Sequence, residues 1–204
     1  LVGIGTDNPQ ANLHIFEGTG STRTPAASGN NLVIDSNSEV GMSLLFGTDA
    51  NTAYGNIYWG NSTDGSADGR ITYFGSTYAT AADRQAMTFR TANTERLRID
   101  SSGRVLLGTT TVGDGSADNL TIADVGHCGM TIRSGTSSVG GIYLGDGTSG
   151  SDQYRGFIEY NHSGDHLRFG TSSSEKLRIT SAGRMGVGTN DPAALLEVRD
   201  SENT

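Results

Sequence analysis

The chain repeats itself, and this repetition limits the folds open to it more than any other feature. Residues 95–109, ERLRIDSSGRVLLGT, and residues 175–189, EKLRITSAGRMGVGT, are identical at nine of fifteen positions at an offset of 80. A partial third copy opens the chain, because residues 1–15, LVGIGTDNPQANLHI, match residues 184–198, RMGVGTNDPAALLEV. Short blocks that recur while the loops between them change length are typical of an array of stacked units.

Weaker similarities fill the interior. Residues 55–60, GNIYWG, resemble residues 140–145, GGIYLG, and the ITY of residues 71–73 resembles the IEY of residues 158–160. The offsets drift from 80 to 87, so the loops differ in length while the blocks persist. The sequence is therefore interpreted as three consecutive pieces: a first repeat over residues 1–104, a second over 105–184, and the start of a third over 185–204.

The best-repeated block predicts a β-hairpin. Apolar Leu97 and Ile99 alternate with arginines, which is the period of a strand with one apolar face. Asp100 and Gly103 stand at the first and fourth positions favoured in a type I turn, and alternation resumes at Val105. Runs of this kind recur along the chain, so the predicted fold class is all-β, built of repeated short strands and hairpins.

Glycine occupies one whole face of two further predicted strands, residues 2–5 (VGIG) and residues 185–188 (MGVG). Glycine inside a strand weakens it and often marks a close approach of another backbone, such as a second chain in a narrow fibre. The alternative is that these glycines only supply bends or bulges. Asn8-Pro9 and Asp191-Pro192 follow, and proline is favoured at the first helical position, so we expect a single helical turn leading to the next strand layer.

The chain is poor in apolar residues, so a lone folded copy is hard to stabilise. Its hydrophobic fraction is 34%, against roughly 45–50% in an ordinary globular domain. Each ordered residue costs roughly 1–2 kcal/mol of backbone entropy, which apolar burial must offset. Cys128 is the only cysteine, so no disulfide can form within the chain. Oligomerisation is the remaining way to stabilise such a chain, and we expect a homo-oligomer.

The charge limits the partners. The formal net charge is −8 and the pI is about 4.8, whereas nucleic acids and anionic membranes attract basic proteins. No apolar run approaches the roughly 20 residues of a membrane-spanning helix. We therefore expect neither a nucleic-acid partner nor membrane insertion.

The motifs VGIGTDNPQANLHI, ERLRIDSSGRVLLGT and MGVGTNDPAALLEV resemble repeats of bacteriophage tail fibres, which often lie upstream of an endosialidase-type intramolecular chaperone domain. Similar segments also occur in some bacterial surface proteins, and the interior of the chain matches only loosely. The resemblance implies an elongated, intertwined homotrimer on the extracellular virion, joined to other tail proteins and taking part in host attachment. No chaperone domain is visible, so its autocleavage chemistry does not carry over.

Two histidines suggest a metal site at first sight. His162 and His166 are four residues apart, a spacing that binds metal on a helix. Residues 163–165, Ser-Gly-Asp, favour a hairpin turn instead, so we expect a turn. A threefold axis that gathers three copies of one histidine around an ion is the alternative.

Acidic loops suggest calcium in the same way. The sequence Asp-Gly-Ser-Ala-Asp occurs at residues 64–68 and 114–118. Oxygen-rich loops can bind calcium, but the spacings of an EF-hand and of the nonapeptide repeat are both missing. Solvated turns are the preferred interpretation, and no cofactor or metal is expected.

Aromatic residues gather in the first repeat. Trp59 aligns with Leu144 and shares a strand face with Ile57, so it is expected in a core. Tyr58 faces the other way. Tyr78 lies in an insertion that the second repeat lacks, which makes its loop the first candidate for contact with a receptor.

Three classes of function follow, and no catalytic motif points to an enzyme. The first is a structural segment that acts as shaft or spacer in a tail fibre. The second is a receptor- or glycan-binding domain of such a fibre or of a bacterial surface adhesin. The third, a polysaccharide-degrading tailspike, would need a groove with paired carboxylates, and the sequence selects no such pair.

Overall fold

The computed structural model describes residues 1–17, 32–36, 40–60 and 68–200. In those residues the regular structure consists of short β-strands and two short 3-10 helices, η1 (Ala81–Asp83) and η2 (Gly150–Tyr154). The predicted all-β class is confirmed. The chain divides into two compact units, Leu1–Cys128 and Gly129–Thr204.

The first unit begins with a small parallel sheet. Its strands are β1 (Val2–Ile4), β2 (Leu13–Glu17) and β3 (Leu32–Ser36). They lie in chain order, and both neighbouring pairs are parallel. Strands that stack in chain order with parallel neighbours give this sheet a β-solenoid-like character.

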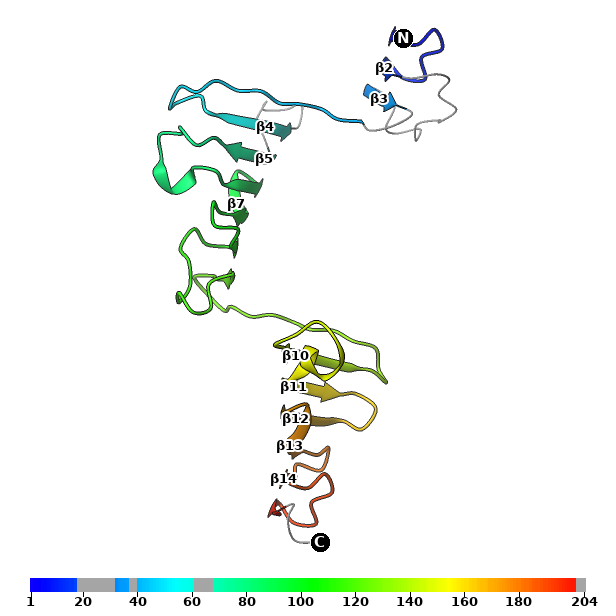
Figure 1. The fold of residues 1–204 in the computed structure, drawn as a ribbon, viewed down its shortest axis with the longest axis vertical. Coiled ribbons are helices and arrows are strands. Elements are labelled where there is room, and N and C mark those ends of the chain that lie inside the picture. The colour runs from blue at the N-terminus through cyan, green and yellow to red at the C-terminus, as the bar shows by residue number, and fades with distance from the viewer. Residues whose placement is uncertain (18–31, 37–39, 61–67, 201–204) are drawn as a thin grey trace. The chain divides into compact units, whose positions relative to one another are not determined.

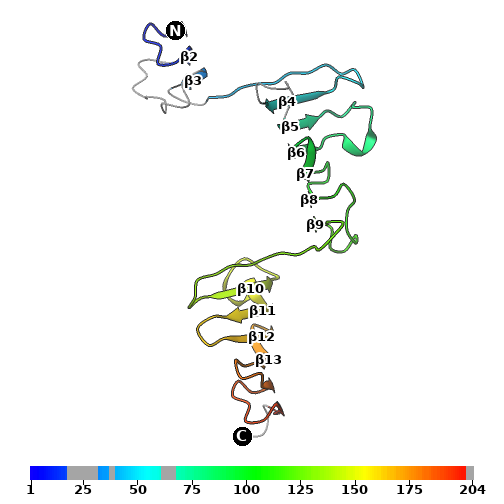
Figure 2. The same ribbon diagram turned by 180° about the vertical axis from the view of Figure 1, so that it is seen from behind.

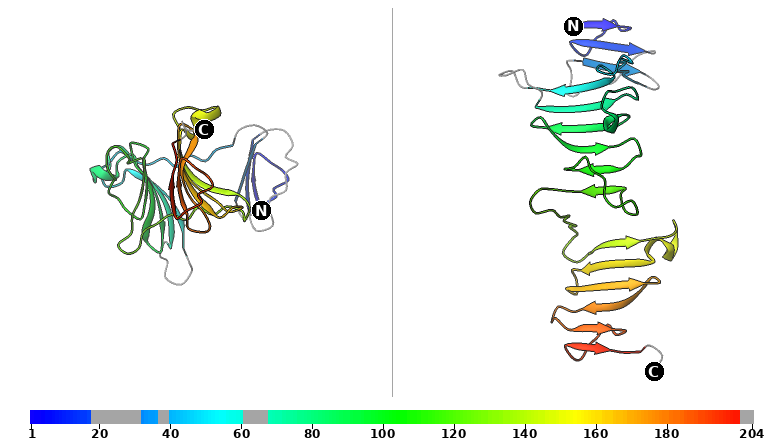
Figure 3. Two further views of the ribbon diagram at one scale, coloured as in Figure 1. Left: turned by 90° about the horizontal axis from the view of Figure 1, so that it is seen from below. Right: turned by 90° about the vertical axis from the view of Figure 1, so that its left-hand side faces the viewer.

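Two six-stranded sheets follow, one in each unit, and their topologies are the same. Each sheet runs in chain order through four antiparallel pairs and ends with a parallel pair (Figures 1 and 2). The right-hand view of Figure 3 shows the strands of each sheet as successive rungs. The first of these sheets comprises β4 (Tyr54–Trp59), β5 (Gly69–Phe74), β6 (Met87–Thr91), β7 (Thr94–Ile99), β8 (Val105–Leu107) and β9 (Leu120–Ile122). The second comprises β10 (Val139–Leu144), β11 (Gly156–Asn161), β12 (His166–Thr171), β13 (Ser174–Ile179), β14 (Met185–Val187) and β15 (Leu196–Val198).

The predicted hairpin is confirmed as β7–β8. Ile99 pairs with Val105, and the Gly103 amide donates to the Asp100 carbonyl at 2.9 Å. The Asp100 carboxylate holds the turn from inside, because Oδ1 accepts from the amides of Ser102 and Arg104. Gly103 has a φ of +80°, which favours glycine at this position.

The weaker similarities in the interior also occupy matching places. Ile57 pairs with Ile71 across β4 and β5, and Ile142 pairs with Ile158 across β10 and β11. The two six-stranded sheets therefore repeat strand by strand, and differences in length fall in the loops.

The repeated glycine motif builds the parallel pairs β1–β2, β8–β9 and β14–β15. A glycine with positive φ follows the first strand of each pair: Gly5, Gly108 and Gly188, at +75°, +72° and +71°. The predicted helical turn is wrong, because the described residues of these crossovers contain no helix. The expectation that this segment carries the chain to the next strand layer is confirmed.

Instead of a helix, each crossover has a hydrogen bond from one of its backbone amides to a side chain of the second strand. The Gln10 amide donates to Nδ1 of His14, and the Ala193 amide donates to the carboxylate of Glu197. In the middle copy the amide of Gly113 donates to Thr121. Three chemically different side chains thus accept the equivalent bond, so the crossover needs an acceptor and not a particular residue type.

The glycines inside these strands do mark a close approach, and it lies within the chain. A Cβ atom on Gly3 would lie 2.5 Å from the carbonyl oxygen of Thr6, and one on Gly186 would lie 2.4 Å from that of Thr189. The middle copy has Leu106 at the same position, fully buried. Its crossover between β8 and β9 is also longer, so the loop has room for a side chain there.

Candidate functional site

Each six-stranded sheet carries one face made almost entirely of apolar side chains, arranged in two columns across the strands. In the β4–β9 sheet one column is Tyr73, Met87, Ile99, Val105 and Leu120, and the other is Ile57, Ile71, Phe89, Leu97, Leu107 and Ile122. In the β10–β15 sheet one column is Tyr160, Leu167, Ile179, Met185 and Leu196, and the other is Ile142, Ile158, Phe169, Leu177, Val187 and Val198. We call this side of each sheet the apolar face.

The apolar face is the uncovered side of the sheet. No residue of either column is buried, and Leu196 and Val198 expose 60% and 69% of their surface. The small parallel sheet follows the same pattern, since Ile4 pairs with Ile15 and Ile15 with Ile34 on one face. Contiguous apolar surface of this kind usually marks an interaction site.

The opposite face carries both polar and apolar side chains, among them the buried Phe74 and Leu106, and it is the covered one. In the first six-stranded sheet its central column contains Thr72, Thr88 and Arg98, all buried. Arg98 is only 5% exposed, and its guanidinium pairs with Glu95 on its own strand and with Asp83 on the loop that precedes β6. Burial alone would lower the pKa of Arg98, but the hydrogen bonds to these two carboxylates raise it, so the side chain stays charged.

In the second six-stranded sheet charged groups replace the threonines. Glu159 and Arg168, at the positions of Thr72 and Thr88, form a cross-strand ion pair. A hydrogen bond to Glu159, together with burial, raises the pKa of Tyr143. The first sheet thus has uncharged hydroxyl groups, of which Thr72 donates to Asn56 at 2.7 Å, where the second has two opposite charges that compensate each other.

Trp59 does not lie in a core. It shares the face of Ile57, as predicted, but 54% of its surface is exposed. It stands beyond the two columns, opposite Gly69, and its indole lies across that glycine, with Cε3 3.7 Å from the Cβ position. Tyr58 projects from the opposite face, as predicted, and Arg70 lies over its ring. The end of β4 therefore presents an aromatic residue on each side.

Tyr78, the expected receptor contact, is half-buried. Its ring packs at 4.7 Å from that of Phe74 and at 5.8 Å from that of Tyr54. Its carbonyl accepts a hydrogen bond from Arg84. Tyr78 thus fixes the long loop between β5 and β6, and receptor contact by that loop stays a prediction.

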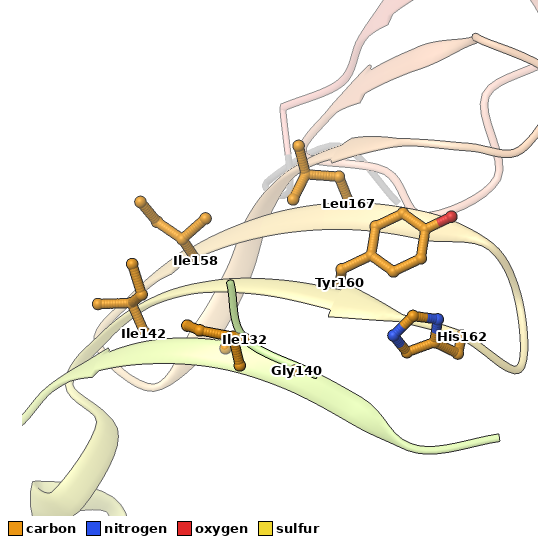
Figure 4. Close-up of a pocket in the computed structure, with 8 residues that line it drawn as sticks. Ile132, Gly140, Ile142, Ile158, Tyr160, His162 and Leu167 are labelled. Atoms are coloured by element: carbon orange, nitrogen blue, oxygen red, sulfur yellow. The ribbon is translucent and has the colours of Figure 1, made fainter. Parts of the chain in front are cut away.

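The predicted turn between the two histidines is confirmed, because His162 is the first residue of the turn that joins β11 to β12 and His166 is the first residue of β12. The His162 ring packs at 5.0 Å against that of Tyr160. Both rings border a shallow pocket of about 330 Å³ on the apolar face, with Ile132 and Leu167 on its other sides (Figure 4).

This pocket has a simple cause. Its floor is Gly140, which stands where the first apolar column would continue onto β10. In the other sheet Gly55 has the same place, and Phe46 fills it, with Cδ1 3.3 Å from the Cβ position. In the second sheet the smaller side chains of Ser134 and Ile132 take that place, with Oγ and Cγ2 at 3.3 and 3.7 Å from the Cβ position of Gly140, and a gap stays open. The pocket is therefore a missing side chain in the apolar face, and part of the same surface.

The acidic loops are turns where they can be described. In residues 114–118 the amides of Ser116 and Ala117 bond to Asp114, and Asp118 pairs with Arg104. Most of the other copy, residues 64–68, lies outside the described residues. Among the residues that the structure describes, no group of three or more His, Cys, Asp or Glu is placed to hold a metal ion. None of the described helices is long and apolar enough to cross a membrane.

The chain matches no protein-family model and no curated protein.

Proposed function

We propose that this chain is a structural segment of a bacteriophage tail fibre, acting as shaft or spacer in host attachment, and that it works as a homotrimer. The apolar face is the observation that carries the proposal. Each six-stranded sheet places eleven apolar side chains in two columns and leaves them uncovered. A soluble monomer rarely exposes a contiguous apolar surface of this extent.

Further copies of the same chain are the partner that fits. Each of the three described sheets carries such an apolar face, so a neighbouring copy offers a matching surface. Three copies around one axis would turn these faces inward and leave the opposite faces, which the chain covers with its own loops, outside. The tail-fibre setting and the choice of three copies rest on the resemblance of the repeated motifs to phage fibres, and the role is structural, not enzymatic.

A pair of neighbouring substitutions tests the buried face. Ile57 and Tyr58 are both exposed and adjacent on β4, but only Ile57 belongs to the apolar face. Ile57→Asp should lower the mass measured by light scattering, because it places a charge in the proposed interface. Tyr58→Asp, on the other face beside Arg70, should leave the mass unchanged. Equal masses for both variants would contradict burial of the apolar face.

The alternative is a receptor- or glycan-binding domain, and the exposed aromatic residues at the end of β4 favour it. Trp59 and Tyr58 are each 54% exposed there, and exposed aromatic rings can stack on sugars. Screening the assembled protein against an array of bacterial surface glycans separates the two functions. A spacer should bind none of them, whereas binding that is lost on Trp59→Ala would establish the alternative.

A further inference from the structure

Two arginines face each other on the covered side of the first six-stranded sheet. Arg70 on β5 pairs with Arg90 on β6, and cross-strand partners of this kind have Cβ atoms about 4.5–5.5 Å apart. Both side chains project to the face of Thr72 and Thr88, which stand two residues away on the same strands. Like charges placed directly opposite each other destabilise a sheet, so this pair requires compensation.

The carboxylates beside this pair are bound to another arginine. Glu95 comes within 3.8 Å of Arg90, but its hydrogen bonds, at 2.7 and 3.1 Å, are accepted from Arg98. Asp83 also pairs with Arg98, at 2.6 Å. Both carboxylates therefore compensate the charge of Arg98, and Arg90 has no carboxylate of its own among the described residues.

Arg70 has an aromatic neighbour instead of an acidic one. Its guanidinium lies over the ring of Tyr58, 5.9 Å from the ring centre, and no carboxylate of the described residues lies within ion-pair distance of it. The Nε atoms of Arg70 and Arg90 are both buried without a hydrogen-bond partner, while the two side chains are otherwise partly exposed. Buried donors of this kind normally have an acceptor.

The second six-stranded sheet shows that the fold does not require two arginines here. The positions of Arg70 and Arg90 are taken there by Phe157 and Gly170, which pair across β11 and β12. The Phe157 ring lies directly against the glycine, because a Cβ on Gly170 would be 2.0 Å from its Cε1 atom. An uncharged, close-packed pair thus serves the same place in the sheet.

The charges on the covered face of the second sheet are also matched. Arg168 pairs with Glu159, and Arg178 pairs with Glu175, so each arginine has its own carboxylate. The uncompensated positive charge is therefore particular to the first sheet, in a chain whose net charge is −8.

We infer that Arg70 and Arg90 form a binding site for a small oxoanion, of the class of phosphate, sulfate or carboxylate. A guanidinium presents paired N–H donors that match two oxygens of such an anion. An anion held by both guanidiniums replaces their repulsion with two attractions, and the Tyr58 ring lies beside Arg70 on the side away from Arg90. The site lies within one sheet, on the face that the proposed homotrimer leaves outside, and does not depend on that proposal.

Titration of the full chain with inorganic phosphate, measured by calorimetry in Tris buffer at constant ionic strength, tests the site. Binding should saturate at one phosphate for each chain. Arg70→Phe combined with Arg90→Gly copies the residues of the second sheet, so this variant should fold and lose the saturable binding. Arg90→Gln alone should weaken binding about tenfold or more, because it removes hydrogen bonds to a charged group.

The control is Arg133→Gln. It removes the same charge as Arg90→Gln, but from an exposed arginine of the second unit, and should leave phosphate binding unchanged. No saturable binding by the unaltered chain, or equal binding by Arg70→Phe/Arg90→Gly, would mean an adventitious ion only and overturn the site. Light scattering measures the assembly separately, so this failure leaves the homotrimer standing.

Competition with polygalacturonate, a polysaccharide that carries carboxylates, identifies the source of the anion. Displacement of phosphate from the unaltered chain would support a site that accepts an acidic group of a glycan, and would favour the receptor-binding alternative. Binding of free phosphate without displacement would support a site for a free ion, which agrees with a spacer.

Discussion

Gly108 and Gly103 form a matched pair that tests the close approach at the crossover. Both have positive φ, at +72° and +80°, and they lie five residues apart on either side of β8. A Cβ on Gly103 would meet nothing within 4 Å, whereas one on Gly108 would lie 2.3 Å from the carbonyl oxygen of Ala123. Substitution by alanine therefore adds the same backbone strain at both positions and a steric clash at only one.

The expected magnitudes follow from this difference. Left-handed backbone costs a residue with a Cβ about 1–2 kcal/mol, so Gly103→Ala should lose about that much stability. At Gly108 the overlapping oxygen belongs to Ala123, whose amide donates to the Leu107 carbonyl at 2.9 Å. Moving that residue disturbs the β8–β9 ladder, and overpacking of this kind costs about 1–3 kcal/mol more.

The assay is urea denaturation followed by circular dichroism, with all proteins at one concentration, because the midpoint of an assembling protein depends on concentration. Gly108→Ala should unfold at clearly lower urea than Gly103→Ala. Gly188→Ala and Gly183→Ala provide an independent repeat of the comparison, with a 2.1 Å approach to the Arg199 carbonyl at one site and open space at the other. Equal losses within both pairs would refute the close-approach argument.

Three further predictions concern the array, its buried charge and its response to acid. Deleting residues 104–183 joins equivalent points of two repeats, so the product should fold with a sharp transition, and a molten or insoluble product would count against stacked units. Arg98→Ala leaves two partly exposed carboxylates without their partner, so it should lower the free energy of unfolding by about 3 kcal/mol, the low end for breaking a buried ion pair. The control is Arg96→Ala, which removes an exposed arginine and should change that free energy by less than about 0.5 kcal/mol. A hydrogen bond from the Ala193 amide and, after it, one from Arg199 lower the pKa of Glu197 below its ordinary value of 4.5. The stability that the ionised carboxylate adds to the fold is therefore complete above pH 4.5 and is lost as the pH falls through the lower pKa of the folded state. Denaturation midpoints against pH should show a smaller acid loss for Glu197→Gln than for the unaltered chain, and identical curves would contradict this role.

Local sequence chemistry was enough to predict the hairpins. Alternation at Leu97 and Ile99, followed by Asp100 and Gly103 in turn positions, depends only on neighbouring residues, and the structure has this hairpin. The helical turn after Asn8-Pro9 failed because the nearby amide of Gln10 bonds to the side chain of His14, a residue of the next strand. A prediction made from one local segment cannot include a hydrogen-bond partner on the next strand.

The two faces of the sheets were harder to anticipate. An arginine that alternates with apolar residues, such as Arg98, would ordinarily be placed in solvent and its apolar neighbours in a core. Here a loop that carries Asp83 folds over the arginine side, and the apolar side stays open. Trp59 was placed in a core for the same reason, and its position beyond the two columns depends on strand register across the sheet.

A single chain leaves the apolar faces of its described sheets uncovered, so its mass in solution tests the proposed homotrimer most directly. Light scattering coupled to size exclusion should give about three times the chain mass of 21.3 kDa, with the elution volume of an elongated particle. That mass should persist on dilution until the protein unfolds, because no stable folded monomer is expected. A compact, folded monomer at micromolar concentration would contradict the account.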